Sequence, residues 1–210
     1  MPTTWVGLLR GVNVGGNTIR SADLVTALRD AGFARVKAVL ASGNVLVEDD
    51  DDDNPTDAGI AADAVARAGA VRSPEGLARR RADVRRRLEA AIDARYGYGV
   101  AVAVVRLDEM QAVIEAYPFD EVPDRHPYVT FATDRGLIDS LAEEAAAIST
   151  DGSGAGLERT SVGDGVLYWE VAKGSSTDSP FAKISSRARY RTGAEAITTR
   201  NLRTLRKLLW

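Results

Sequence analysis

The residues with the clearest chemical potential lie in a glycine- and asparagine-rich stretch near the start of the chain. An apolar run ends at Arg10, and the sequence continues as Gly-Val-Asn-Val-Gly-Gly-Asn over residues 11–17. A guanidinium, amide side chains and exposed backbone N–H groups are groups that bind phosphate or carboxylate. The stretch therefore predicts an anion-binding loop with Arg10 as the charged partner.

Two nucleotide-binding motifs do not fit this loop. No Lys-Ser or Lys-Thr pair follows its glycines, and their spacing differs from the dinucleotide-binding fingerprint. A purely conformational role is the competing interpretation, in which Gly15, Gly16 and Gly43 supply positive φ angles and the asparagines bond to neighbouring backbone. Arg10 weakens that interpretation, because a charged loop residue needs a partner and no acid is near it in sequence.

Composition limits the class of protein. The chain has 210 residues, of which 45% are hydrophobic and 27% charged, and this is typical of one large or two small globular domains. It contains no cysteine, which excludes disulfides, thiolate metal ligands and a cysteine nucleophile. No apolar stretch approaches the roughly 18 residues that span a bilayer. We expect a cytoplasmic protein without membrane contact or cofactor, and the single histidine, His126, does not suggest a metal site.

The formal net charge of -3 conceals two oppositely charged regions. The acidic region is predicted to form a solvated, poorly ordered loop over about residues 49–75, because its composition cannot bury enough apolar surface. A calcium site is the alternative, but the run of aspartates at 49–53 lacks the alternating ligand spacing of a calcium loop. The basic region covers 173–210, and a run of arginines at 79–87 is interpreted as the solvated face of a helix.

The first half of the chain alternates between strand and helix patterns. The glycine turn Ser42-Gly43-Asn44 separates two β-rich runs, which indicates a hairpin. Helices are expected over about 22–31, with Ser21 as N-cap, and from about Leu77 to Tyr96. Together with strands at 4–10 and 100–105, these elements give the order βαββαβ, which is the ferredoxin-like pattern.

The second half repeats this rhythm after a connecting helix near 108–116. Strands are expected at 127–133, 157–162, 165–172 and 196–199, and helices at 137–148, 179–189 and the C-terminus. The predicted fold class is α+β: tandem ferredoxin-like (βαββαβ) units with antiparallel sheets and a C-terminal helix. The expected domains are residues 1–107 and 108–210.

This topology predicts how the motifs meet. The first and second strands of such a unit run toward the same end of the sheet, so the loop after Arg10 lies beside the Ser42-Gly43-Asn44 hairpin. Thr199, Arg200 and Asn201 stand near the start of the final helix, where N–H groups favour an anion. We therefore predict that these three residues lie across a cleft from Asn13 and Asn44. The alternative is that Arg200 bridges the units as a clamp.

Three motifs carry a resemblance to a known family. LLRGVNVGGN, ASGNVLV and ITTRNLRTLRKLL occur in that order and resemble the uncharacterised bacterial family called domain of unknown function 1697 (DUF1697). Residues 10–16, 42–44 and 198–201 match the family's motifs, although Leu202 replaces its usual tryptophan. The resemblance implies a tandem α/β fold, an inserted segment near 49–75 and no established activity.

The functional hypothesis is a cytoplasmic binding protein for a small anionic or phosphate-bearing ligand. The alternatives are a metal-independent enzyme that uses an Asp or Glu as acid or base at the same edge, and a nucleic-acid-binding protein, which the negative net charge disfavours. A third interpretation is that the motifs only lock the two units together. The sequence does not specify an oligomeric state. The candidate ligand-binding residues are Arg10, Gly11, Asn13, Gly15, Gly16, Ser42, Gly43, Asn44, Thr199, Arg200 and Asn201.

Overall fold

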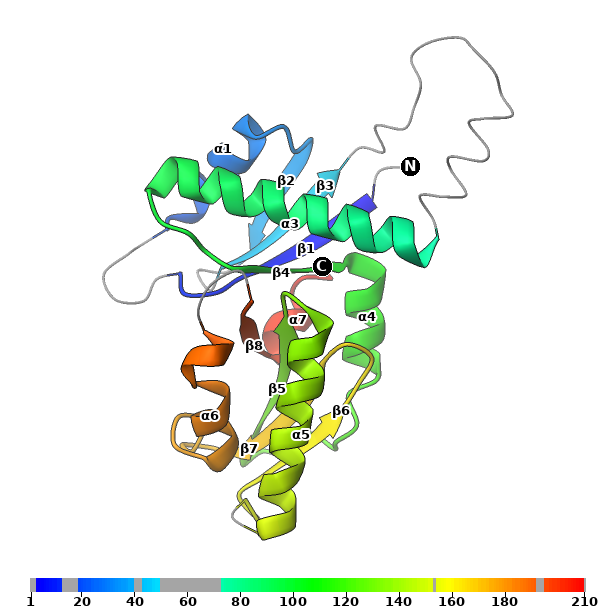
Figure 1. Cartoon of the computed structure of the whole chain (residues 1–210), viewed down its shortest axis with the longest axis vertical. Coiled ribbons are helices and arrows are strands. Elements are labelled where there is room, and N and C mark those ends of the chain that lie inside the picture. Colours follow the sequence, from blue (N-terminus) through cyan, green and yellow to red (C-terminus); the bar gives the residue numbers. More distant parts are fainter. Residues whose placement is uncertain are drawn as a thin grey trace.

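The computed structural model describes residues 3–12, 19–39, 43–49, 73–152, 154–191 and 195–209, with the side chains of 149–151 left aside (Figure 1). Four candidate residues, Asn13, Gly15, Gly16 and Ser42, lie outside these ranges, as does most of the predicted acidic loop. Among the described residues, no helix has the length and apolar character needed to cross a membrane.

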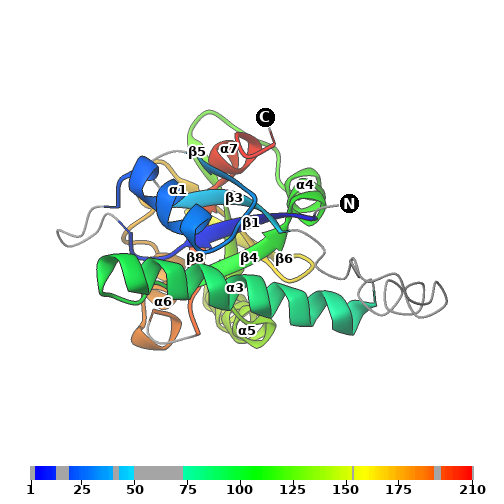
Figure 2. The same cartoon turned by 90° about the horizontal axis from the view of Figure 1, so that it is seen from above.

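The first unit is a four-stranded antiparallel sheet with two helices on one face. Its order β2-β3-β1-β4 and its βαββαβ succession confirm the ferredoxin-like prediction. Figure 2 shows the two helices together on one side of the sheet. The elements are β1 (Thr3–Leu9), α1 (Ser21–Asp30), β2 (Arg35–Val39), β3 (Asn44–Asp49), α3 (Pro74–Tyr96) and β4 (Val102–Arg106).

The second unit repeats this plan, and α4 (Leu107–Glu115) connects it to the first. Its sheet is also antiparallel, with the order β6-β7-β5-β8. The predicted helix at 179–189 is two shorter elements, because α6 ends at Ser185 and a 3-10 turn, η1, follows. The elements are β5 (Arg125–Ala132), α5 (Arg135–Asp151), β6 (Glu158–Val162), β7 (Leu167–Ala172), α6 (Pro180–Ser185), η1 (Ala188–Tyr190), β8 (Ile197–Asn201) and α7 (Leu202–Arg206).

Strand β1 is buried on both faces, and this joins the two units. Trp5 and Leu9 pack into the core under α1 and α3. Val6 and Leu8 point the opposite way, as alternation along a strand requires, into a core that also contains Phe131 and residues of α4 and α7. The two units therefore share a core, and the domain boundary at residues 107 and 108, in the first turn of α4, stays a prediction.

The arginine-rich part of α3 is packed against the protein, and the prediction of a solvated helix face is wrong for several of its residues. Arg80 and Arg87 both pair with Asp49 at the end of β3, at 3.3 and 2.6 Å. The Arg85 Nη1 donates to the Thr133 carbonyl of the second unit at 2.9 Å. Tertiary contacts thus bury charges that the local composition assigned to solvent.

Two predicted boundaries also need correction. Helix α1 begins at Ser21, and its N-cap is Arg20, which makes no side-chain capping bond, so Ser21 is not the N-cap. The predicted loop at 49–75 is wrong at both ends. Asp49 is a buried strand residue, and α3 begins at Pro74 with Ser73 accepting a capping hydrogen bond from the Gly76 N–H at 3.1 Å.

Candidate functional site

The end of β1 lies directly beside the β2–β3 hairpin, as the topology predicts. The Leu9 N–H donates to the Gly43 carbonyl at 2.8 Å. Gly43 has a φ of 72°, and a Cβ there would lie 2.3 Å from Val12 Cγ2 and 3.1 Å from Leu9 Cβ. Only glycine combines this backbone conformation with the absence of a side chain. The two loops can therefore approach each other closely.

Asn44 opens β3 with a buried amide side chain that is 1% exposed. Its Nδ2 donates to the Val39 carbonyl at 3.2 Å, which closes the hairpin. Its Oδ1 accepts a hydrogen bond from Arg200 Nε, on β8 of the second unit, at 2.7 Å. The predicted meeting of the Asn44 and Arg200 motifs is thus present, with the amide bound to protein groups at both ends.

Arg200 reaches from the second unit into the end of the first. Its Nη2 donates to the Leu9 carbonyl at 2.6 Å and contacts the Gly43 carbonyl at 3.5 Å. Its Nη1 donates to Thr198 Oγ1 at 2.6 Å and to the Thr199 carbonyl at 3.0 Å. With the Nε bond, these contacts use all five N–H groups of the guanidinium. The geometry is that of a clamp between the units.

The acceptors around Arg200 are all uncharged, so its positive charge is not neutralised by them. Burial, and secondly the positive charge of Arg10, lower the pKa of Arg200 to about 10. Burial also lowers the pKa of Arg10, and the second cause is the positive charge of Arg191. We call Arg10, Arg191 and Arg200 the arginine cluster.

The arginine cluster runs from the interior to the surface. Arg200 is the most enclosed, Arg10 is half-buried and Arg191, just after η1, is exposed. Arg10 donates from Nη1 to the Ile197 carbonyl of β8 and so also bridges the units. In the described part of the chain, none of the three forms an ion pair with a carboxylate. Within the described part of the chain, no carboxylate therefore neutralises the three positive charges of the cluster.

Thr199 and Asn201 do not join the arginine cluster. Thr199 Oγ1 hydrogen-bonds Thr130 Oγ1 at 2.9 Å, and Asn201 caps α7 by accepting from the Arg203 N–H at 3.0 Å. Because side chains alternate along β8, it is Thr198 that shares a face with Arg200. Sequence reasoning missed Thr198 and Arg191. The period of two gave a signal for Thr198, whereas no local pattern indicates Arg191.

Fold and site together define a class: an α+β protein of two ferredoxin-like units with a cluster of arginines where they meet. The chain belongs to the family described as "Protein of unknown function (DUF1697)", whose sequence profile matches residues 2–73 and 67–168. The resemblance drawn from the motifs is confirmed. The Thr-Thr-Arg-Asn motif at 198–201 lies beyond the matched residues.

A solved structure supports the fold over the whole chain. It is described as a conserved bacterial protein from Streptococcus pneumoniae, with 21% sequence identity and a TM-score of 0.61 over 100% of this chain and 99% of that one. At this identity the similarity concerns the fold alone. No curated protein matches the sequence.

Proposed function

We propose that this protein binds a small anionic ligand, such as a phosphate-bearing molecule, at the arginine cluster. The observation that carries the proposal is that the positive charge of Arg10 acts on Arg200 and that of Arg191 acts on Arg10, while none of the three forms an ion pair among the described residues. An anion placed between them offsets this repulsion and supplies the missing counter-charge.

The contacts divide the roles within the cluster. Arg200 has committed its N–H groups to the protein, so it contributes charge and holds the units together. Arg10 makes one side-chain hydrogen bond within the described part of the chain, and Arg191 is exposed. Direct contact with the ligand is therefore assigned to Arg10 and Arg191.

The backbone of Gly11, next to Arg10, is open to a ligand. It has a φ of 76°, is exposed, and a Cβ built there would meet nothing within 4 Å. A ligand can therefore approach this backbone closely. Asn44 acts indirectly, because its amide positions Arg200 and faces the interior.

The alternative functions have less support from the contacts. RNA-recognition modules of this topology use an open sheet face. Here the face of β1 that carries Val6 and Leu8 is buried against the second unit. An acid–base enzyme needs a carboxylate at the edge, and the side-chain hydrogen bonds that Arg10 and Arg200 make with the described residues involve none. The small anion is the function that the geometry favours.

The test is thermal unfolding in the presence of inorganic phosphate, pyrophosphate and a nucleoside monophosphate, with chloride at matched ionic strength as reference. A ligand at 100 times its Kd stabilises the folded state by about 2.7 kcal/mol. We expect at least one phosphate compound to raise the Tm of the native protein. The Arg10→Gln variant should lose that response, whereas Arg79→Gln, on an exposed position of α3, should keep it. A response equal in both variants, or none beyond chloride, would contradict the proposal.

A further inference from the structure

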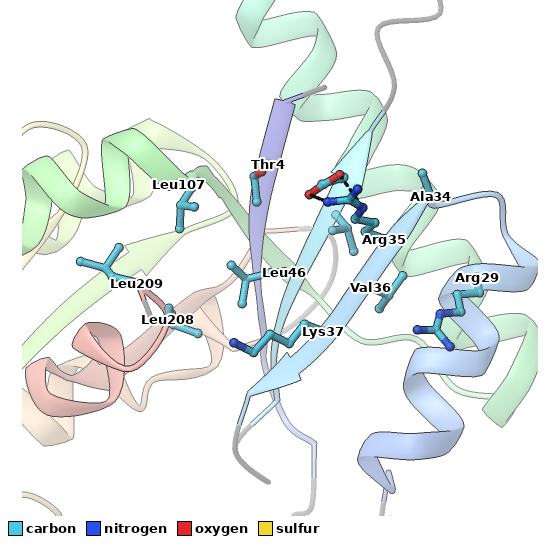
Figure 3. Close-up of a pocket in the computed structure, with 12 residues that line it drawn as sticks. Thr4, Arg29, Ala34, Arg35, Val36, Lys37, Leu46, Leu107, Leu208 and Leu209 are labelled. Atoms are coloured by element: carbon cyan, nitrogen blue, oxygen red, sulfur yellow. Dashed lines mark hydrogen bonds and ion pairs between the residues drawn. The ribbon is translucent and has the colours of Figure 1, made fainter. Parts of the chain in front are cut away.

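A groove lies at the opposite end of the first sheet from the arginine cluster. Thr4 and Arg35 stand near the starts of the parallel strands β1 and β2, whereas Arg10 and the hairpin follow their ends. The groove has a volume of about 520 Å³, within the range of small-molecule sites. Its lining residues are Thr4, Arg29, Ala34, Arg35, Val36, Lys37, Leu46, Val47, Glu48, Leu107, Leu208 and Leu209 (Figure 3).

One wall of the groove is apolar and comes from three parts of the chain. Leu46 belongs to β3, Leu107 opens α4, and Leu208 and Leu209 follow α7. Leu208 is buried in the core shared by the units, and the other three are partly exposed at its border. The core thus reaches the surface here, which leaves apolar surface available to a ligand.

The other side of the groove is cationic. Arg29, Arg35 and Lys37 line it, and Glu48 is the single carboxylate among its described lining residues. The Arg35 side chain is 80% exposed and lies 3.5 Å from Glu48. Lys37 is paired with Leu46 in the β2–β3 register, and its side chain extends across Leu46 toward Leu208 (Figure 3). Positive charge therefore stands directly beside the leucines.

We propose that this groove binds an amphiphilic organic anion, a carboxylate or sulfonate with an aliphatic or aromatic body. The apolar body packs on Leu46, Leu107 and Leu209, and the acidic head lies between Lys37 and Arg35. Charge complementarity and the adjoining apolar wall argue for this class of ligand. A second copy of the chain is the less suitable occupant, because pairing two β2 edges brings their Arg35 and Lys37 charges together. This site is independent of the arginine cluster and of the function proposed for it.

The probe is 8-anilinonaphthalene-1-sulfonate, an aromatic sulfonate whose fluorescence rises in apolar surroundings, followed by displacement with decanoate. We expect saturable binding by the folded protein and displacement by decanoate but not by inorganic phosphate. The double variant Arg35→Glu with Lys37→Glu changes two exposed side chains, so it should fold and bind the probe about tenfold more weakly or less. Arg79→Glu with Arg86→Glu makes the same change in net charge on α3 and should bind as the native protein does.

Further variants separate the remaining outcomes. Leu46→Glu should also weaken probe binding, and its urea unfolding curve shows whether it is folded. Arg10→Gln should leave probe binding unchanged, which distinguishes this groove from the arginine cluster. Equal affinity in the two double variants, or failure of decanoate to displace the probe, would overturn the proposal. So would a dimer in sedimentation that Arg35→Glu with Lys37→Glu dissociates, since the groove would then be a contact between copies.

Discussion

The Nε atom of Arg200 lies 2.7 Å from Oδ1 of Asn44, although 156 positions separate the two residues in sequence. This bond connects β8 of the second unit to β3 of the first. Salt screens attraction between charges, but the acceptors around Arg200 are an amide, a hydroxyl and carbonyls. The junction between the units is therefore expected to persist at high ionic strength.

Replacing Arg200 should destabilise the protein even without a ligand. Arg200→Ala removes the guanidinium hydrogen bonds to the Leu9 carbonyl and to Asn44 Oδ1, and loss of a hydrogen bond to a buried acceptor costs about 1–3 kcal/mol. We expect the free energy of unfolding in urea to fall by about 3 kcal/mol. Arg203→Ala, at an exposed position of α7, should change it by less than about 0.5 kcal/mol. Similar values for both variants would show that the clamp contributes little.

Gly43 and Gly11 form a matched pair for testing the close approach of the two loops. Both have positive φ angles, 72° and 76°, but only Gly43 is crowded. Gly11→Ala should cost about 1–2 kcal/mol, which is the penalty for the left-handed backbone alone. Gly43→Ala should cost clearly more, because its Cβ meets Val12 and Leu9. Urea unfolding of both variants measures the difference, and equal costs would mean that the hairpin shifts freely.

Asp49 should contribute far more to stability than its acidic surroundings in the sequence indicate. Asp49→Ala removes the shared partner of Arg80 and Arg87 and should lower the free energy of unfolding by about 3 kcal/mol. Asp83→Ala breaks the exposed pair with Arg86 on α3 and a longer contact of 4.0 Å with Arg87, which together should cost less than about 1 kcal/mol. Chemical denaturation measures the free energy of unfolding of both variants. A decrease of similar size in the two would contradict the packing of α3 on β3.

The neighbouring rings of Tyr117 and Tyr168 should respond in opposite directions to loss of the hydroxyl. Their centroids are 5.7 Å apart. The Tyr168 hydroxyl donates to the Val113 carbonyl at 2.9 Å, whereas the buried Tyr117 hydroxyl has no hydrogen-bond partner among the residues that the structure describes. Tyr117→Phe should therefore raise the free energy of unfolding by about 1 kcal/mol, and Tyr168→Phe should lower it by about 1 kcal/mol. Thermal or urea unfolding decides, and a loss in Tyr117→Phe would show that its hydroxyl has a partner in solution.

The same tyrosine predicts a pH dependence. Burial, and secondly the charge of Glu170, raise the pKa of Tyr117 above its ordinary value of 10.0. The unfolded state then ionises first, so the contribution of Tyr117 is complete below pH 10 and is lost as the pH rises above it. Stability measured at about pH 8 and about pH 10.5 should fall less in Tyr117→Phe than in the native protein. An equal loss of stability in the variant and in the native protein would mean that other groups cause the alkaline destabilisation.

Local patterns predicted the succession of elements well. Apolar runs separated by glycine turns indicate both βαββαβ units, and strand directions follow from that topology. The meeting of Arg10 with the Gly43 hairpin could be inferred for the same reason, since β1 and β2 are parallel. These inferences hold because backbone pairing depends on periodicity and turns, which are local properties of the sequence.

Properties that depend on tertiary contacts could not be predicted in this way. Asp49 is the first of five consecutive aspartates, yet it ends β3 opposite the arginines of α3. Arg191, just after η1, acts on Arg10 through its positive charge, although 181 positions separate the two residues in sequence. Thr199 and Arg200 are both candidate ligand-binding residues of one motif. Their side chains point to opposite faces of β8, so Thr199 bonds Thr130 and Arg200 bonds Asn44.

The core shared by the two sheets has a consequence for cooperativity. Val6 and Leu8 are completely buried in a core to which the connecting helix α4 and the second unit contribute. An isolated first unit would expose this face to water, and the repeated topology therefore does not coincide with an autonomous folding unit. The two repeats should melt in a single calorimetric transition, with equal van't Hoff and calorimetric enthalpies.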